Sequence, residues 1–483
     1  MSALDPRTPV LVGVGTAEGD HEGVELMAQA LAAAAVDAGS STLLGAVDRI
    51  AVPQGTWSYP DPARLLGARI GAPGATTCLA QIGISQQTLV NEALRAITAG
   101  HCDVAVVAGG EARARARRAE VAGTVATETA QPGAVPDLVM NREDDFMARP
   151  EINAGLTQPV LQYALIENAL GAAEGVGIDE HRASIARLWE RFNIVARSNP
   201  DAAFPTARSA AELATASAEN RPLAFPYNKW HASQWTVDQA AALVMCSVEA
   251  ARAHHVPLDR WLFPLVGIDA SHAVSLSRRR DLHRWPSMAV LAEAAAGRTG
   301  RPLDEIEHIE LYSCFPSAVR VQQRELGVPL DGTPTITGGM AFAGGPFNNF
   351  VYQATAAMAH LLRREPSAQG LVSTVCGLLT KPGLAVWSAT PDGRPPLLGD
   401  LATEASAATE RVEVVDEHHG PARVATATVG YAGLVPARSF VLADTGPGHR
   451  CVASSDSPDV AEAVVSGDLI GTVVSVAGTE VRL

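Results

Sequence analysis

The first part of the chain alternates short apolar runs with longer stretches in which apolar residues recur every three or four positions. The apolar runs cover residues 10–15, 49–52, 75–79 and 103–110, and helical patterns cover 23–38, 62–71 and 84–99. Apolar runs of four to six residues separated by helices are typical of parallel strands that are covered on both faces. The pattern therefore predicts an α/β domain.

A second α/β pattern follows after residue 250. Strands are expected at residues 263–269, 306–312, 371–376 and 384–388, and helices at 288–296, 317–326 and 350–362. The segment 111–227 has a different character, with polar loops and helical patterns such as 179–195. We therefore expect two similar halves, 1–250 and 251–390, with a helical insertion at about 111–227 in the first.

The pattern changes once more at the turn-rich segment 391–396, which reads as a linker. Short β-type runs follow at residues 412–415, 424–431, 439–443 and 469–483, and the last contains a turn at Ala477 and Gly478. Many short strands without a long helix are typical of a small antiparallel barrel. We expect such a barrel, OB-like, over residues 397–483.

Composition narrows the class of protein. The 483 residues are 47% hydrophobic and 18% charged, which excludes a disordered or fibrous chain. The net charge of -15 argues against nucleic acid and anionic membranes as partners. The cysteines are scattered and no histidine pair stands at metal-binding spacing, so no metal site is expected. The N-terminal residues lack an export pattern, and the Ala-rich stretch 24–36 is too short to span a bilayer, so we expect a cytoplasmic protein.

The duplicated halves, the insertion and the Gly-rich second half resemble the thiolase superfamily. The segments 225–229 (FPYNK), 237–241 (VDQAA) and 379–381 (LTK) look like the type 1 thiolase-like proteins of actinobacteria, which are related to sterol-carrier-protein-type thiolases. This resemblance spans nearly the whole chain. It implies a duplicated five-layered thiolase fold with a C-terminal barrel and an acyl-CoA ligand. Coenzyme A would be part of the substrate with no separate cofactor, and the chain would be a monomer or a homodimer.

The resemblance also implies where the chemistry of the family would lie. Thiolases use a nucleophilic Cys at a helix N-terminus, an Asn or His, the His of a GHP motif and a second Cys. By this comparison Gly83 takes the position of the nucleophile, Tyr312 that of the Asn or His, and Gly345 that of the GHP His, while Cys376 matches the second Cys. The substrate is expected to lie against Gly345 and three further positions: Ser85, His231 and Gly344.

Three functions remain open at this point. The chain resembles an acetyl-CoA acetyltransferase of lipid metabolism, but without a sulfur atom at Gly83 no acyl-enzyme can form, and Gly345 supplies no imidazole. It would then bind an acyl-CoA thioester without ordinary thiolase activity. Alternatively, Tyr312 could act as acid or base in an aldol lyase that cleaves a β-hydroxyacyl-CoA. The structural alternative is that Tyr312 only packs, with its hydroxyl bonded to the backbone. The third function is a binding or scaffolding protein without catalysis.

Overall fold

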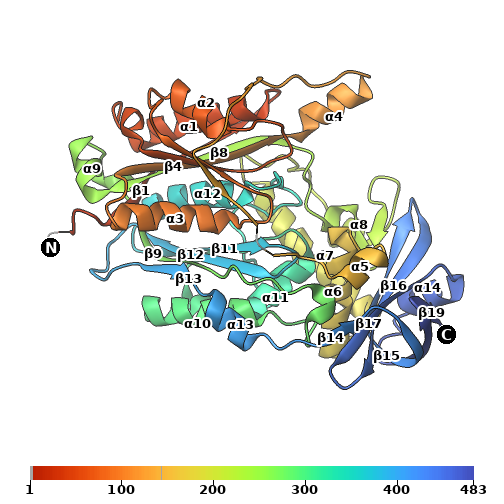
Figure 1. Cartoon of the computed structure of the whole chain (residues 1–483). Coiled ribbons are helices and arrows are strands. Elements are labelled where there is room, and N and C mark those ends of the chain that lie inside the picture. Colours follow the sequence, from red (N-terminus) through yellow and green to blue (C-terminus); the bar gives the residue numbers. More distant parts are fainter. Residues whose placement is uncertain (1–3, 143) are drawn as a thin grey trace.

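The computed structural model describes residues 4–142 and 144–483, so residues 1–3, on which the export-signal expectation partly rests, lie outside it. Two sheets are stacked in the body of the protein, with helices outside each sheet and a further pair of helices between them (Figure 1). This arrangement of helix, sheet, helix, sheet and helix gives five layers. The α/β prediction is confirmed, and a smaller β-rich part lies at the end of the body where the insertion helices gather.

The first sheet has six strands in the order β1-β8-β4-β2-β3-β5. Their bounds are Pro9–Glu18 for β1, Arg49–Pro53 for β2, Thr76–Ala80 for β3, Val104–Ala112 for β4, Leu138–Met140 for β5 and Asp238–Ser247 for β8. The sheet is mixed rather than wholly parallel, because β8 returns from the insertion and pairs antiparallel with both β1 and β4. Strand β5 pairs with β3 and occupies the edge of the sheet.

The second sheet repeats the pattern of the first. Its order is β10-β11-β12-β9-β13, with bounds Phe263–Asp269 for β9, His308–Glu310 for β10, Gln369–Cys376 for β11, Lys381–Ser388 for β12 and Leu397–Asp400 for β13. Strand β12 pairs antiparallel with β11 and β9, as β8 does with β4 and β1. Strand β13 lies in this body sheet, although residue 397 is the expected start of the barrel segment.

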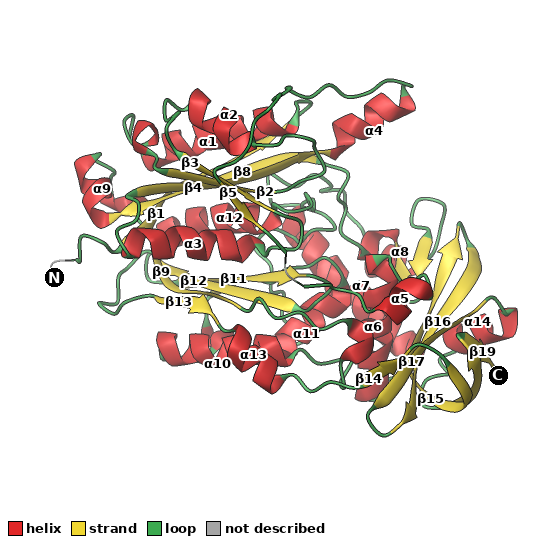
Figure 2. Cartoon of the chain, in the orientation of Figure 1, coloured by secondary structure: helices red, strands yellow, loops and turns green. Residues whose placement is uncertain are grey.

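Helices cover both faces of each sheet (Figure 2). The outer helices are α1 (Gly23–Ala38), α2 (Pro62–Arg69) and α9 (Val248–Ala253) on the first sheet, and α10 (Pro286–Thr299), α11 (Pro316–Leu326) and α13 (Ala402–Ala408) on the second. Between the sheets lie α3 (Gln86–Thr98) and α12 (Phe350–Arg364). The apolar residues of α3 are buried on its inward positions, so this helix belongs to the largest core cluster. The short 3-10 helices are η1 (Leu44–Ala46), η2 (Lys229–His231), η3 (Leu258–Arg260), η4 (Leu276–Arg278) and η5 (Leu303–Glu305).

The insertion leaves the first sheet after β4 and returns to it at β8. It contains α4 (Arg113–Val121), α5 (Arg149–Asn153), α6 (Pro159–Glu174), α7 (Ile178–Ala196), α8 (Ala210–Ala214), β6 (Pro222–Ala224) and β7 (Tyr227–Asn228). Helix α6 packs against the C-terminal part: Asn168 Nδ2 donates to the carbonyls of Phe225 at 3.0 Å and Ala427 at 2.8 Å. The insertion therefore joins the two parts of the molecule.

The C-terminal part is a closed five-stranded barrel. Strands β15 (His418–Ala432), β16 (Val435–Gly446), β17 (His449–Ser455), β19 (Glu480–Arg482) and β18 (Val473–Gly478) pair in a ring that returns to β15. Short strand β14 (Glu413–Val415) adds to β17. The buried Arg450 ties the barrel to the body, because its Nη1 donates to the Arg279 carbonyl at 2.6 Å.

Two details of the barrel differ from the sequence pattern. Strand β17 forms at residues 449–455, where no strand is predicted, because strands on both sides supply its hydrogen bonds and little of its own sequence is apolar. Helix α14 (Pro458–Val465) also forms, although no long helix is expected. Its Val460, Ala461 and Val464 are buried on one face against the barrel core, and this burial stabilises a helix that is too short to persist alone.

None of the helices among the described residues combines the length and the apolar character needed to cross a lipid bilayer.

Candidate functional site

The candidate site lies where the start of α3 meets the end of β11. Gly83 has a φ of +104°, a backbone conformation that favours glycine. Its carbonyl accepts a hydrogen bond from Cys376 Sγ at 3.4 Å. The fold thus brings together two of the residues singled out by the resemblance, although they are far apart in the sequence.

The thiol of Cys376 is held in its neutral form. Burial raises its pKa to about 11, and the nearby Lys381 opposes this only in part. The thiol proton points to a backbone carbonyl, which does not act as a base. Because the thiolate is the reactive form of cysteine, this side chain is a weak nucleophile at neutral pH.

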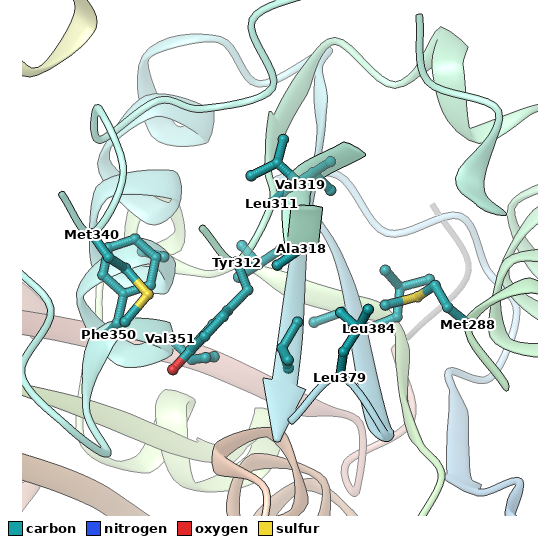
Figure 3. Close-up of a cluster of buried hydrophobic side chains, with 14 of the residues drawn as sticks. Met288, Leu311, Tyr312, Ala318, Val319, Met340, Phe350, Val351, Leu379 and Leu384 are labelled. Atoms are coloured by element: carbon teal, nitrogen blue, oxygen red, sulfur yellow. The ribbon is translucent and has the colours of Figure 1, made fainter. Parts of the chain in front are cut away.

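Tyr312 follows shortly after β10 and lies near Cys376. Its ring meets Phe350 edge to face at 5.8 Å, and Figure 3 shows it beside Val351 with the hydroxyl pointing away from Leu311. Gln86 Oε1 accepts from the Val351 N–H at 2.8 Å, so its amide nitrogen remains to bond the Tyr312 hydroxyl. The hydroxyl is therefore bonded to a side chain. Burial raises its pKa, and the neighbouring Cys314 and Cys376 add to the shift, so the hydroxyl keeps its proton at neutral pH.

Ser85 stands at the N-cap of α3 with its side chain almost fully buried. Its Oγ makes no hydrogen bond to the described residues and does not cap the helix. A buried hydroxyl without a partner is costly, so a ligand or a water molecule at this position would be stabilised. Among the predicted site residues, Ser85 is therefore the strongest candidate for a hydrogen bond to a bound ligand.

The Gly-rich loop before α12 has little free space around it. Gly344 has a φ of +103°, and a methyl group added there would lie 2.2 Å from Gln239 Oε1. A methyl group on Gly345 would lie 3.0 Å from Ser233 Oγ and 3.2 Å from Met340 Cε. An imidazole at position 345 would therefore require its neighbours to move.

His231 is buried beside Tyr227, with the two ring centres 6.1 Å apart. Its Nδ1 accepts from the Asn228 N–H at 3.1 Å, while Nε2 has no hydrogen-bond partner among the described residues. Burial lowers its pKa to about 4, so the ring is neutral near pH 7. No recorded contact joins His231 to Gly83 or Cys376, and its place against a substrate stays a prediction.

Sequence reasoning missed the residue that fills the site. Phe146, from the insertion, packs against Gly83 and Gly377: a methyl group on Gly83 would lie 2.7 Å from the ring atom Cζ, and one on Gly377 would lie 2.4 Å from Cε1. Its ring lies 5.2 Å from both the Arg142 guanidinium and the Lys381 amine. Nothing local in the sequence marks Phe146, since it stands in a polar loop. The buried Lys381, one of only two lysines in the chain, was the available signal.

No group of three His, Cys, Asp or Glu side chains is placed to hold a metal ion within residues 4–142 and 144–483.

Comparisons with known proteins agree with the fold. No protein-family model and no curated protein matches the sequence. A solved structure of a monomeric SCP2-thiolase-like protein type 1 from Mycobacterium smegmatis covers all of both chains, with a TM-score of 0.85 and 28% identity. Human mitochondrial 3-ketoacyl-CoA thiolase (0.57, 17% identity) and an Ltp2-ChsH2(DUF35) aldolase (0.58, 17%) each match over 80% of this chain and 100% of their own. These two show the fold alone.

Proposed function

Because the chain belongs to the thiolase superfamily and is similar throughout to a type 1 SCP2-thiolase-like protein, we propose that it binds an acyl-coenzyme A thioester without carrying out thiolysis or Claisen condensation. The observation that carries this proposal is the contact of Phe146 with Gly83. At the position expected for the nucleophile there is no side chain, and an aromatic ring occupies the adjacent space.

The remaining groups support binding more than covalent chemistry. Ser85 Oγ has no partner among the described residues and is free to donate to a thioester oxygen. Cys376 keeps its proton and bonds the Gly83 carbonyl, and Gly345 offers no base. Loss of catalytic groups that act together lowers rates by up to about a million-fold. The acyl group would therefore be held and oriented but not transferred.

The first experiment measures thiolysis of acetoacetyl-coenzyme A by coenzyme A, with a competent thiolase as the positive control. We expect no turnover above that of buffer. Turnover at ordinary thiolase rates would overturn the proposal.

Binding is measured separately, as the shift in melting temperature with increasing acyl-coenzyme A, because a ligand that binds the native state stabilises it by mass action. We expect Ser85→Ala to reduce the shift. The matched control is Ser439→Ala, which removes another buried hydroxyl without a recorded partner, in the barrel. Equal shifts in both variants would remove Ser85 from the binding site.

A second candidate function rests on Tyr312. Its buried hydroxyl lies beside the Gln86 amide and near Cys376. A phenol that keeps its proton could donate a hydrogen bond to the thioester oxygen as negative charge develops on it during cleavage of a β-hydroxyacyl thioester, with the β-hydroxyl proton leaving to water. If a lyase activity is found, Tyr312→Phe should abolish it while leaving the fold intact. A lyase activity that survives this change would exclude the role.

A further inference from the structure

Lys381 is a buried cation at the end of the candidate site. It begins β12 and faces Cys376 across the turn that joins β11 to β12. Its side chain is 6% exposed, and its Nζ lies 3.3 Å from Asp144 Oδ2. A buried ammonium is costly unless an anion pairs with it. The anion here comes from the loop of the insertion that also carries Phe146.

We call residues 144–146 the plug. It supplies a carboxylate to Lys381 through Asp144 and an aromatic ring to Gly83 and Gly377 through Phe146. The two glycines provide the space for the ring, because a side chain at either position would overlap it. The surroundings of the plug thus accommodate two groups side by side, an aromatic ring against the glycines and a carboxylate against Lys381.

The plug lies outside the regular secondary structure and is more exposed than the lysine with which it pairs. Residues 144–146 belong to no helix or strand and precede the short helix α5. The side chain of Asp144 is 40% exposed, whereas Lys381 is buried, and Phe146 is only half-buried. Removing the plug would uncover Gly83 and Gly377 and would leave the Lys381 charge without its partner. A ligand that brings its own carboxylate would restore that pairing.

We propose that the plug occupies a binding pocket in place of a ligand, and that this ligand is a hydrophobic carboxylate whose acid group pairs with Lys381. The carboxylate could belong to a free acid or to the far end of an acyl group on a thioester. In the second case the inference rests on the proposed function and names its acyl group. In both cases the ligand competes with Asp144 for the lysine and with Phe146 for the space beside Gly83.

The first test measures binding of 3-phenylpropanoate by calorimetry, with 3-phenylpropanamide as the uncharged analogue. Phe146→Ala should bind the acid about 10-fold more tightly than the unchanged protein, because the ligand no longer displaces the ring. The control Phe204→Ala removes another half-buried phenylalanine, which packs on Trp230, and should leave the affinity unchanged. Equal affinity of the Phe146→Ala variant for the acid and the amide would overturn the proposal.

The second test concerns the charge. Lys381→Met in the Phe146→Ala background should remove binding of the acid, and Asp144→Asn in the unchanged chain should strengthen it. Asp144→Asn changes a partly exposed side chain, so this arm does not depend on the folding of the lysine variant. If Asp144→Asn weakens or does not alter binding, the lysine does not receive the ligand.

Chemical labelling gives an independent readout, because Lys229 and Lys381 are the only lysines. Reductive methylation followed by peptide mass spectrometry should modify Lys381 faster in Phe146→Ala than in the unchanged protein, with Lys229 as the internal control. Addition of 3-phenylpropanoate should slow the labelling of Lys381 alone. Unchanged labelling of Lys381 on opening the plug would contradict the model of a covered pocket.

A third arm separates the two sources of the carboxylate. Glutaryl-coenzyme A and butyryl-coenzyme A are compared on Phe146→Ala with and without Lys381→Met. A preference for the glutaryl ester that depends on Lys381 would assign the carboxylate to an acyl group. Binding of 3-phenylpropanoate but of neither ester would sink the proposed thioester function and leave the pocket in place. If both esters bind equally well with and without Lys381, the proposed carboxylate site is excluded and the thioester function is retained.

Discussion

The two halves of the body repeat the same antiparallel strand pair and connect it in different ways. In the first half β4 runs to β8 through the whole insertion, residues 113–237, and Ala112 faces Asp238 at the open end. In the second half β11 turns into β12 over residues 377–380, so that Cys376 faces Lys381. The long connection supplies Phe146 and Asp144, and the short one supplies the glycine and the lysine that they touch.

This difference places a constrained hairpin and an unconstrained loop on opposite sides of the candidate site. The tight turn holds Cys376, Gly377 and Lys381 within a rigid hairpin, so these groups are positioned by backbone hydrogen bonds. The insertion is free of that constraint and reaches across to the hairpin. The hairpin thus forms one side of the candidate site with fixed residues. The insertion loop forms the other side, and its residues can be replaced without disturbing either sheet.

The largest loss of stability should come from adding a side chain at Gly83, next to Phe146 of the insertion. We expect Gly83→Ala to lower the free energy of unfolding by about 2–4 kcal/mol, because its positive φ disfavours alanine and the new methyl group overlaps Phe146. Urea denaturation measures the loss.

Combining this change with Phe146→Ala completes a double-mutant cycle. The pair should be more stable than the sum of the single losses predicts, since the overlap with the ring is relieved while the overlap with Arg142 Cδ and the backbone strain remain. Strict additivity would show that the ring does not occupy the space beside Gly83.

The next largest effect concerns the short connection. The pKa of Cys376 is raised from 9.0 to about 11, so at pH 8 the native protein should contain about 100-fold less Cys376 thiolate than the unfolded chain. Its alkylation rate, followed by peptide mass spectrometry, should keep rising towards pH 11, whereas that of the urea-unfolded chain should level off near pH 9.

The raised pKa of Cys376 also makes the free energy of unfolding depend on pH. Because the folded pKa is the higher one, the neutral thiol contributes stability below about pH 9, and this contribution is lost as the pH rises through about 11. A native alkylation rate that levels off below pH 8 would mean that Cys376 is activated, and it would reopen covalent chemistry at this site.

A smaller effect is expected where the two connections form an ion pair. Asp144→Asn should lower the free energy of unfolding by about 1–2 kcal/mol, because the partly exposed aspartate limits the loss while the buried Lys381 is left without its anion. Thermal denaturation in low and high salt measures it, with Asp145→Asn, a more exposed neighbour, as the control. A loss of several kcal/mol would mean that the plug is a structural element and does not open.

We expect no effect from a change at the outer edge of the first sheet. There β5 pairs with β3 and forms the edge of the first sheet. The second sheet has no strand that corresponds to β5, and β10 forms its edge. Strand β5 presents an exposed Val139, so Val139→Glu should leave the mass in solution, measured by light scattering, the same as that of the unchanged chain. A dimer that dissociates on this change would show that β5 forms an interface.

Much of the architecture could be predicted because it depends on local patterns. Strand β9 at residues 263–269 and the helix at 178–196 follow from apolar periodicity within one element, and Gly344 before α12 marks a positive φ. Strand β17 and helix α14 were not predictable in this way. Their stability comes from neighbours in the barrel, and their own sequences carry weak signals.

For the candidate site, the sequence alone determined which side chains are available: a glycine at 83, a thiol at 376 and one of two lysines at 381. Only the tertiary structure decided that Phe146 and Asp144 fill the space among them. The physical reason is the range of the interactions. Periodicity and turn chemistry act over a few residues, whereas the plug is selected by a cavity and a buried charge that exist only after both halves and the insertion have packed together.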